Sequence, residues 1–127
     1  MDILISGGTV IDGSGAPGFV ADVGISGDAI EAIGDLSDLA PNAARVIDAK
    51  GLTVSPGFID THTHSDGILL WDPQHANGLR QGITTEILGQ DGLSYAPLSP
   101  ENYPIYRRYI SGILGEPPEG LDMSSVS

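Results

Sequence analysis

The chain has 127 residues, enough for one domain of ordinary size, and its composition is strongly acidic. Five lysines and arginines against 17 aspartates and glutamates give a formal net charge of −12, which argues against a nucleic-acid partner because phosphate backbones are bound by clustered cations. There is no cysteine, and no apolar run approaches the roughly 20 residues that cross a bilayer, so we expect no disulfide, no thiolate ligand and no membrane partner. The N-terminus lacks the basic and apolar regions of a secretory signal, so we expect a cytoplasmic location.

The first half of the chain is predicted to form a small β-rich module. Apolar and β-branched segments alternate with turn residues, and six of them are predicted strands: 2–5, 9–11, 23–26, 29–33, 45–47 and 52–54. The pair Gly27-Asp28 lies between two of these segments, as a two-residue hairpin turn does. The pattern predicts a small antiparallel sheet.

The second half of the chain changes to an alternation of strand and helix. Residues 58–62 are a short apolar run that ends in polar side chains, as a buried parallel strand does. Asp72 resembles a helix cap with Pro73 at the first helical position, which predicts a helix over 73–81. Residues 83–88, rich in β-branched side chains, form the next predicted strand. Strand, helix and strand make a βαβ unit, whose parallel strands carry their functional loops on one edge of the sheet.

A further helix is predicted towards the end of the sequence. Apolar side chains recur at helical spacing over 106–114, and Gly115 followed by two prolines closes the segment. Arg107 and Arg108 fall on the polar face of this helix, and we expect both to lie in solvent. Residues 122–127 begin like another capped helix.

Two histidines stand where the predicted strand over 58–62 ends. His62 and His64 are two residues apart, so on a strand both imidazoles leave the same face and can reach one metal ion. Histidine is a common zinc ligand, and convergent imidazoles at a strand end are frequent in catalytic sites. The pair alone is equally compatible with two surface histidines near a turn. His75 falls on the predicted crossover helix, and we expect it to be a surface residue.

The sequence around the two histidines resembles a known family. The segment PGFIDTHTHSD, residues 56–66, looks like the first barrel strand of the amidohydrolase superfamily, where such a segment follows a small β-module. LISGGTVID (4–12) and DAKGL (48–52) are similar to that family as well. Within the superfamily, three motifs are similar to the N-acyl-D-amino-acid deacylase (D-aminoacylase) branch: HSD (64–66), QGITT (81–85) and GQDGLSYAP (89–97).

The resemblance implies a fold of two parts. Residues 1–56 would be the N-terminal part of a small antiparallel β-sandwich module, and residues 57–127 the first βα units of a (β/α)8 TIM barrel. A complete barrel needs about 250 residues, so the barrel is incomplete in this chain. We expect the remainder to come from further sequence or from a second chain, and the two strands to expose apolar surface in its absence. A truncation, a cleavage product and a subunit are all compatible with this expectation.

The resemblance also implies a metal site formed by His62, His64 and Asp91. Asp91 stands where the deacylase branch commonly has a cysteine ligand. A carboxylate can replace a thiolate on zinc but is a harder ligand, so the expected divalent metal is zinc, with manganese as the alternative. Asp91 also suits a turn before Gly92. Asp66 is expected to orient a histidine or contact the substrate, unless it is an exposed loop carboxylate. The general-base aspartate of the family comes from the last barrel strand, outside this chain.

The activity implied by the resemblance is metal-assisted hydrolysis of an amide C–N bond in a small molecule, most closely an N-acyl-D-amino acid. The chain alone is expected to be inactive. One alternative is a cyclic amide or imide hydrolase of the dihydroorotase or hydantoinase type, which is less similar because dihydroorotases usually place an arginine near the position of Asp66. Another is a non-catalytic scaffold fragment, built on the β-half, in which the histidines are vestigial.

Overall fold

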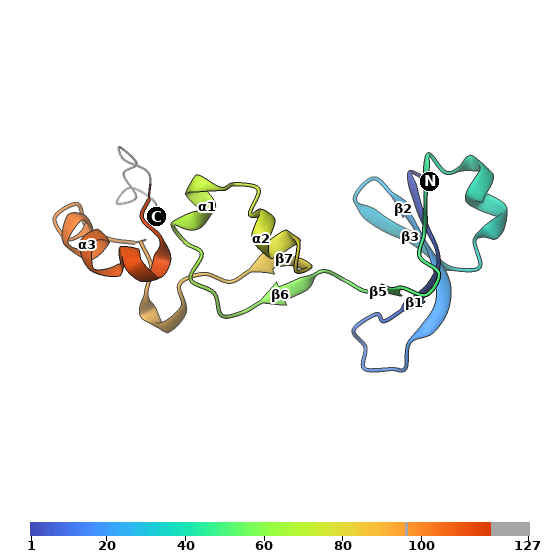
Figure 1. Cartoon of the computed structure of the whole chain (residues 1–127), viewed down its shortest axis with the longest axis horizontal. Coiled ribbons are helices and arrows are strands. Elements are labelled where there is room, and N and C mark those ends of the chain that lie inside the picture. The colour runs from blue at the N-terminus through green and yellow to red at the C-terminus, as the bar shows by residue number, and fades with distance from the viewer. Residues whose placement is uncertain (96, 118–127) are drawn as a thin grey trace. The chain divides into compact units, whose positions relative to one another are not determined.

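The computed structural model describes residues 1–95 and 97–117, and the chain divides into two compact units, Met1–Pro56 and Gly57–Ser127 (Figure 1). The first unit carries a five-stranded sheet, and the second carries a pair of parallel strands with three α-helices among its described residues. Within the described part of the chain, no helix combines the length and the apolar character needed to cross a membrane.

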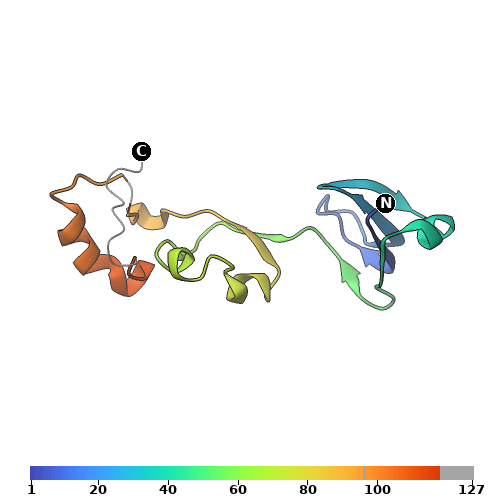
Figure 2. The ribbon, with the colours of Figure 1, turned by 90° about the horizontal axis from the view of Figure 1, so that it is seen from above.

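The sheet of the first unit is mixed. Its strands are β1 (Ile3–Val10), β2 (Phe19–Ser26), β3 (Ala29–Gly34), β4 (Arg45–Asp48) and β5 (Thr53–Val54). The order is β3-β2-β1-β4, with β5 paired to the far part of β1, and Figure 2 shows the β2–β3 hairpin beside β1. β2 runs antiparallel to β1 and β3, whereas β4 and β5 run parallel to β1.

The expectation of a purely antiparallel sheet was therefore wrong for the last two strands. The 3-10 helix η1 (Ser37–Asn42) follows β3 and leads the chain back to the start of β1. The Ala44 N–H donates to the Met1 carbonyl at 3.3 Å, and the Arg45 N–H to the Asp2 carbonyl at 2.9 Å. β4 consequently enters the sheet beside the beginning of β1 and runs in the same direction.

A β-bulge within β1 joins two segments that were predicted as separate strands. The segments predicted at 2–5 and 9–11 are joined in β1, whose pairing with β2 shifts register between Ile5 and Gly8. Gly7, in that interval, has φ 72°, a left-handed conformation that glycine adopts without a steric cost. Two glycines in a row therefore mark a bulge within one strand and not the turn between two strands.

The core of the first unit lies against one sheet. Val10, Ala21 and Val23 are buried together, with partly buried Ile5 and Val54 packed against them. An apolar pocket of about 240 Å³ is lined by Val10, Val23, Ile5 and Val54, among others. The described residues of this unit form a single sheet, so the second layer of a sandwich stays a prediction.

A buried aspartate ties three strands of this sheet together. Asp22 on β2 is 8% exposed, and its carboxylate accepts hydrogen bonds from Gly7 N (2.7 Å), Ser6 Oγ (3.0 Å) and Leu36 N (3.0 Å). The bond from the Leu36 N–H is the largest influence on the pKa of Asp22 and lowers it. Burial, the second largest, raises the pKa, and the bonds from Gly7 and Ser6 lower it further, so the net shift is downward. The ionised carboxylate thus holds the bulge of β1 and the end of β3 to β2.

Asp22→Asn is expected to destabilise the protein by about 1 to 2 kcal/mol at pH 7, because an amide presents N–H groups where the backbone offers donors. The folded-state pKa of Asp22 lies below its unfolded value, so the stabilisation is present above about pH 4, the usual aspartate value, and is lost as the pH falls through the folded pKa. Urea unfolding at pH 7 and pH 3 measures both effects. The exposed turn residue Asp28 is the matched control, and an Asp28→Asn variant that lost as much stability would contradict the assignment.

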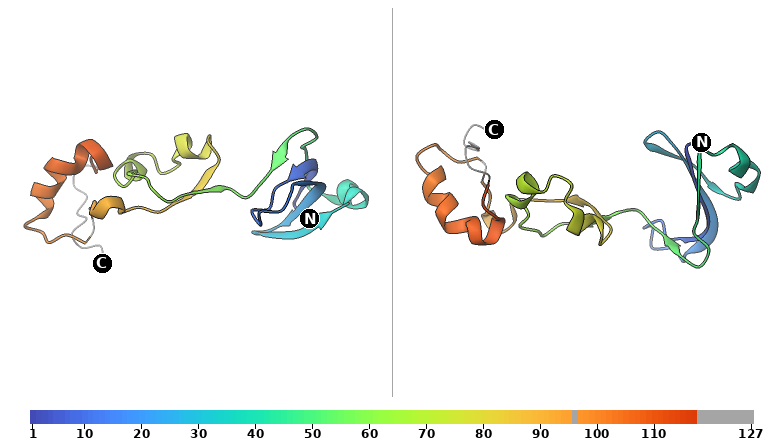
Figure 3. Two further views of the ribbon diagram at one scale, coloured as in Figure 1. Left: turned by 90° about the horizontal axis from the view of Figure 1, so that it is seen from below. Right: turned by 45° about the horizontal axis from the view of Figure 1, so that its top comes forward.

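The second unit is built on two parallel strands. Its elements are β6 (Phe58–Asp60), α1 (Ile68–Trp71), α2 (Ala76–Leu79), β7 (Ile83–Glu86), the 3-10 turn η2 (Gln90–Gly92) and α3 (Tyr103–Leu114). β6 and β7 pair in parallel, which confirms the predicted strand–helix–strand unit. Figure 3 shows α1 and α2 on one side of the strand pair, and α2 contacts β7.

The predicted helix over 73–81 was wrong in its bounds. Asp72 ends α1 instead of capping a helix, Pro73 lies in a turn, and α2 covers only Ala76–Leu79. The reason is His75, whose left-handed backbone (φ 45°, ψ 48°) interrupts a right-handed helix. The Asp72 carboxylate nevertheless accepts a hydrogen bond from Ala76 N at 3.3 Å across this interruption.

The helix predicted towards the end of the sequence is confirmed as α3, and Gly115 ends it with φ 76°. Ile110 and Leu114 are buried on its inner face, in a cluster that also contains Tyr95. Arg108 is exposed as expected, but Arg107 is not. The guanidinium of Arg107 pairs with Glu116 at 3.1 Å and donates to the Pro117 carbonyl at 2.9 Å. The helix predicted from residue 122 lies outside the described residues.

The strand pair exposes apolar side chains, as expected of parallel strands that lack neighbours. Phe58 and Ile59 on β6 are 60% and 63% exposed, and Ile87, directly after β7, is 48% exposed. Strands of a parallel sheet are usually covered on both faces, so this surface needs further elements to cover it.

Candidate metal centre

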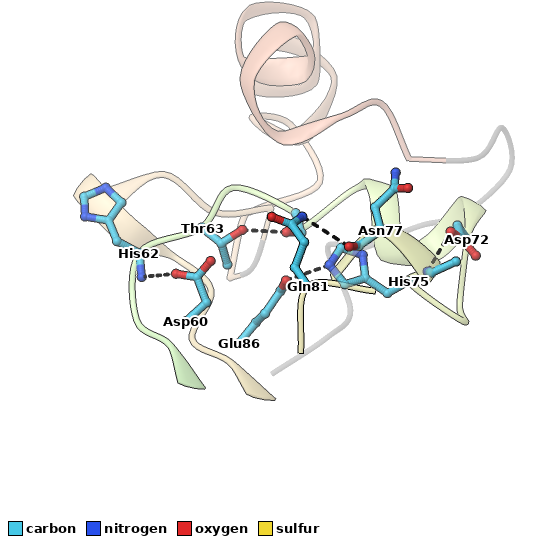
Figure 4. A network of polar contacts seen from close by, with 10 residues as sticks. Asp60, His62, Thr63, Asp72, His75, Asn77, Gln81 and Glu86 are labelled. Carbon is cyan, nitrogen blue, oxygen red and sulfur yellow. Dashed lines mark hydrogen bonds and ion pairs between the residues drawn. The ribbon is translucent and has the colours of Figure 1, made fainter. Parts of the chain in front are cut away.

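The candidate ligands stand in the two loops that follow β6 and β7. β6 ends at Asp60, so His62 and His64 lie in a loop and not on the strand. The expectation that strand alternation places both imidazoles on one face was therefore wrong. A local turn replaces it: the His62 N–H donates to Asp60 Oδ1 at 3.0 Å (Figure 4). The two rings meet edge to face, with centroids 5.6 Å apart and an interplanar angle of 87°.

Asp91 lies against both histidines. Its Oδ2 is 3.1 Å from His62 Nε2 and 3.4 Å from His64 Nε2. One ligand atom from each of the three residues lies within 4.8 Å of the other two, and among the described residues this is the group of imidazoles and carboxylates that could hold a metal ion. The structure thus brings together the three residues that the sequence predicted as ligands.

The backbone at Asp91 is shaped to present this carboxylate. Asp91 has φ 58° and ψ 18°, and the flanking Gly89 and Gly92 are also left-handed, with φ 79° and 72°. A non-glycine residue in this region costs of the order of 1 kcal/mol or more, and aspartate is among the residues that tolerate it best. Asp91 is therefore both a turn residue and a residue whose carboxylate faces the histidines, so these two expectations are compatible.

Two buried polar atoms near the candidate ligands, His64 Nδ1 and Asp66 Oδ2, have no hydrogen-bond partner among the described residues. Asp66 is partly buried, so it does not lie in an exposed loop. Desolvation is the largest influence on the pKa of Asp66 and raises it, while the nearby His64 and a backbone hydrogen bond from Gly89 lower it by less. The carboxyl group is thus held where ionisation is unfavourable.

Asp66→Asn is expected to raise stability at pH 7 slightly, because it removes a charge that burial disfavours while solvent screens much of the effect. The folded-state pKa of Asp66 is raised, so the penalty is absent below the unfolded pKa of about 4 and complete above the folded pKa. The gain should therefore appear in urea unfolding at pH 7 and vanish at pH 3. A variant less stable than the wild type at pH 7 would show that the ionised carboxylate has a stabilising partner.

His75 was expected at the surface, and this was wrong. Its side chain is 21% exposed, and Nε2 lies 2.6 Å from Oε1 of Glu86, which is itself 10% exposed (Figure 4). The sequence held one signal of this pair. Glu86 stands in a strand otherwise made of isoleucine and threonine, where a carboxylate needs a partner to be buried.

The chemistry of the three candidate ligands fits a divalent metal ion. Two imidazole nitrogens and one carboxylate oxygen are ligands that zinc and manganese both accept. No thiolate is present in the chain to give the site softer character.

Comparison with known proteins places this geometry in a family. The family model described as "Amidohydrolase family" matches residues 45–121. A D-aminoacylase of Alcaligenes xylosoxydans xylosoxydans is 50% identical over 103 residues, which are 81% of this chain and 21% of the relative. A crystal structure of a D-aminoacylase, described as defining a novel subset of amidohydrolases, is 46% identical with a TM-score of 0.72 and covers 99% of this chain and 23% of that one.

A third relative was crystallised with a metal. The N-acyl-D-glutamate deacylase from Bordetella bronchiseptica, complexed with zinc and a phosphonate inhibitor, is 44% identical with a TM-score of 0.71, over 77% of this chain and 20% of the relative. The chain thus spans about a fifth of the length of the relatives that it matches. The family match covers more than half of the chain and includes both histidines and Asp91. The chain belongs to the amidohydrolase family.

Proposed function

We propose that this chain supplies the first metal ligands of an N-acyl-D-amino-acid deacylase, which hydrolyses the amide C–N bond of a small N-acylated amino acid. The observation that carries the proposal is the convergence of His62, His64 and Asp91 at the ends of two parallel strands. The relatives point to the substrate class, because a D-aminoacylase and an N-acyl-D-aspartate deacylase are 50% and 48% identical to the chain.

The fold proposal follows the division of the chain. Residues 1–56 belong to a β-sandwich module, and residues 57–127 begin a TIM barrel that further sequence or a second chain completes. The boundary between the two compact units at Pro56 and the exposed apolar surface of β6 support this assignment. Completion of the barrel also brings the general-base aspartate, so this chain alone is inactive.

In the proposed reaction the residues of this chain bind and orient. His62 and His64 each offer Nε2 to a divalent ion, and Asp91 offers Oδ2. A divalent ion held there, zinc or manganese, would acidify a bound water and polarise the scissile carbonyl. Asp66 lies beside His64, where its carboxyl group orients the imidazole or contacts the substrate.

The test is metal analysis and substrate selectivity of the completed enzyme. We expect stoichiometric divalent metal after purification, and release of free amino acid from N-acetyl-D-amino acids at least about a hundredfold faster than from the L-enantiomers, which corresponds to about 2.7 kcal/mol of discrimination. A dihydropyrimidine or hydantoin serves as the competing substrate. Faster opening of the cyclic amide would reassign the enzyme, and a metal-free protein that hydrolyses neither substrate would leave only the scaffold alternative.

A further inference from the structure

From the geometry we infer that His75 is a positioning residue for the metal centre, acting through Glu86 and the paired ends of β6 and β7. This inference rests on the proposed metal site. His75 lies in the connection between α1 and α2, touches none of the three candidate ligands in the contacts described above, and has no role in the proposed hydrolysis.

The His75–Glu86 contact is enclosed. Nε2 of His75 and Oε1 of Glu86 are 2.6 Å apart, and the two side chains are 21% and 10% exposed. They line a pocket of about 230 Å³ whose other walls include Leu69, Leu79 and Leu88. A charge-assisted hydrogen bond in such surroundings is strong, and its loss leaves a carboxylate buried without a partner.

The chain is shaped around the imidazole of His75. His75 itself adopts the left-handed conformation, which a histidine rarely does unless its surroundings enforce it. Gly78 leaves room for the ring, because a Cβ at that position would lie 2.5 Å from His75 Cδ2. A special backbone angle and a glycine three residues later thus both serve to keep the imidazole against Glu86.

Glu86 is joined to both arms of the candidate metal site. It is the last residue of β7 and pairs in register with Asp60, the last residue of β6. The next residue, Ile87, donates its N–H to the Asp60 carbonyl at 2.9 Å. The Asp60 carboxylate accepts the N–H of His62, and Figure 4 shows Asp60 and Glu86 at neighbouring strand ends, between His62 and His75.

The position of Glu86, which His75 holds, therefore affects the positions of the candidate ligands. His62 follows Asp60 by two residues, and Asp91 follows Glu86 by five, so a shift of Glu86 changes the separation of ligand atoms that now lie within 4.8 Å. Metal ions bind well only to a narrow range of ligand geometry. Substitution of residues that hold the metal ligands in place typically lowers metal affinity about 10- to 100-fold.

The experiment compares three variants of the completed enzyme. His75→Leu removes the donor, His75→Gln keeps an N–H that can reach the carboxylate, and Leu79→Ala removes packing from the same pocket without touching the pair. Zinc affinity is measured by chelator competition, ligand geometry by the visible absorption of the cobalt(II)-substituted protein, and stability by thermal unfolding of the metal-free form.

We expect His75→Leu to lower zinc affinity about tenfold or more and to shift the cobalt absorption bands, with His75→Gln restoring both. Leu79→Ala, at a side chain that is 56% exposed, should leave zinc affinity within about twofold of the wild type. If His75→Leu binds zinc like the wild type, or if Leu79→Ala loses as much affinity, the inference is overturned while the metal site stands. A wild-type enzyme that binds no metal would overturn both the inference and the proposed function.

Discussion

Replacing His64 by alanine in the completed enzyme is expected to abolish amide hydrolysis, with a loss in kcat/KM of at least about a thousandfold, equivalent to about 4 kcal/mol of transition-state stabilisation. His64 is the more enclosed of the two histidines, 26% exposed against 61% for His62. A ligand that is already held in place loses little freedom when it binds, so its removal should cost more metal affinity than removal of His62.

The measurement pairs steady-state kinetics with metal content, because loss of the ion and loss of activity should coincide. Thr61→Ala is the matched control, since Thr61 is an exposed residue in the same loop and offers no imidazole. Excess zinc should restore part of the activity of His62→Ala, which keeps the more enclosed imidazole, but little of that of His64→Ala. A His64→Ala variant that keeps its metal and its activity would remove His64 from the site.

The parts of the fold that follow from local pattern were predictable from the sequence. The parallel pair β6 and β7 and the helix α3 rest on side-chain periodicity and on terminating glycines, which act within a few residues. The direction of β4 was not predictable in this way. It depends on where η1 brings the chain back beside β1, and a long-range contact of this kind leaves no local signature.

The candidate site shows the same division between local and long-range information. The three candidate ligands were predicted by motif. Strand alternation was the expected reason for the convergence of the two histidines, whereas the structure places them in a turn after β6. Asp60 bends the chain before His62, and the left-handed Asp91 turns its carboxylate back towards the imidazoles. His75 was misplaced because helical spacing says nothing of a partner eleven residues further along, on the next strand.

Substitution of Asp91 is expected to separate its role as a ligand from its role in the turn. Asp91→Asn keeps the size of the side chain and the tolerance for a left-handed backbone, so the stability of the metal-free protein should change by less than about 0.5 kcal/mol. Asp91→Asn removes the charge of the ligand, so affinity for zinc and for manganese should fall at least about 100-fold. This loss is larger than that usually seen for residues that only hold a ligand in place. Asp91→Gly relieves the strain of the left-handed backbone and removes the carboxylate. It should therefore raise the stability of the metal-free protein and bind metal as weakly as Asp91→Asn.

Asp91→Cys should change the preference of the site and not only its strength. A thiolate is a softer ligand than a carboxylate, so the ratio of cadmium to manganese affinity should rise at least about tenfold over the wild type in competition titrations. The wild-type site, with two imidazoles and a carboxylate, should conversely retain measurable manganese affinity. If Asp91→Asn binds zinc as tightly as the wild type, Asp91 is a turn residue that only hydrogen-bonds to the histidines. The short contact to His62 would then describe a metal-free arrangement that the ion displaces.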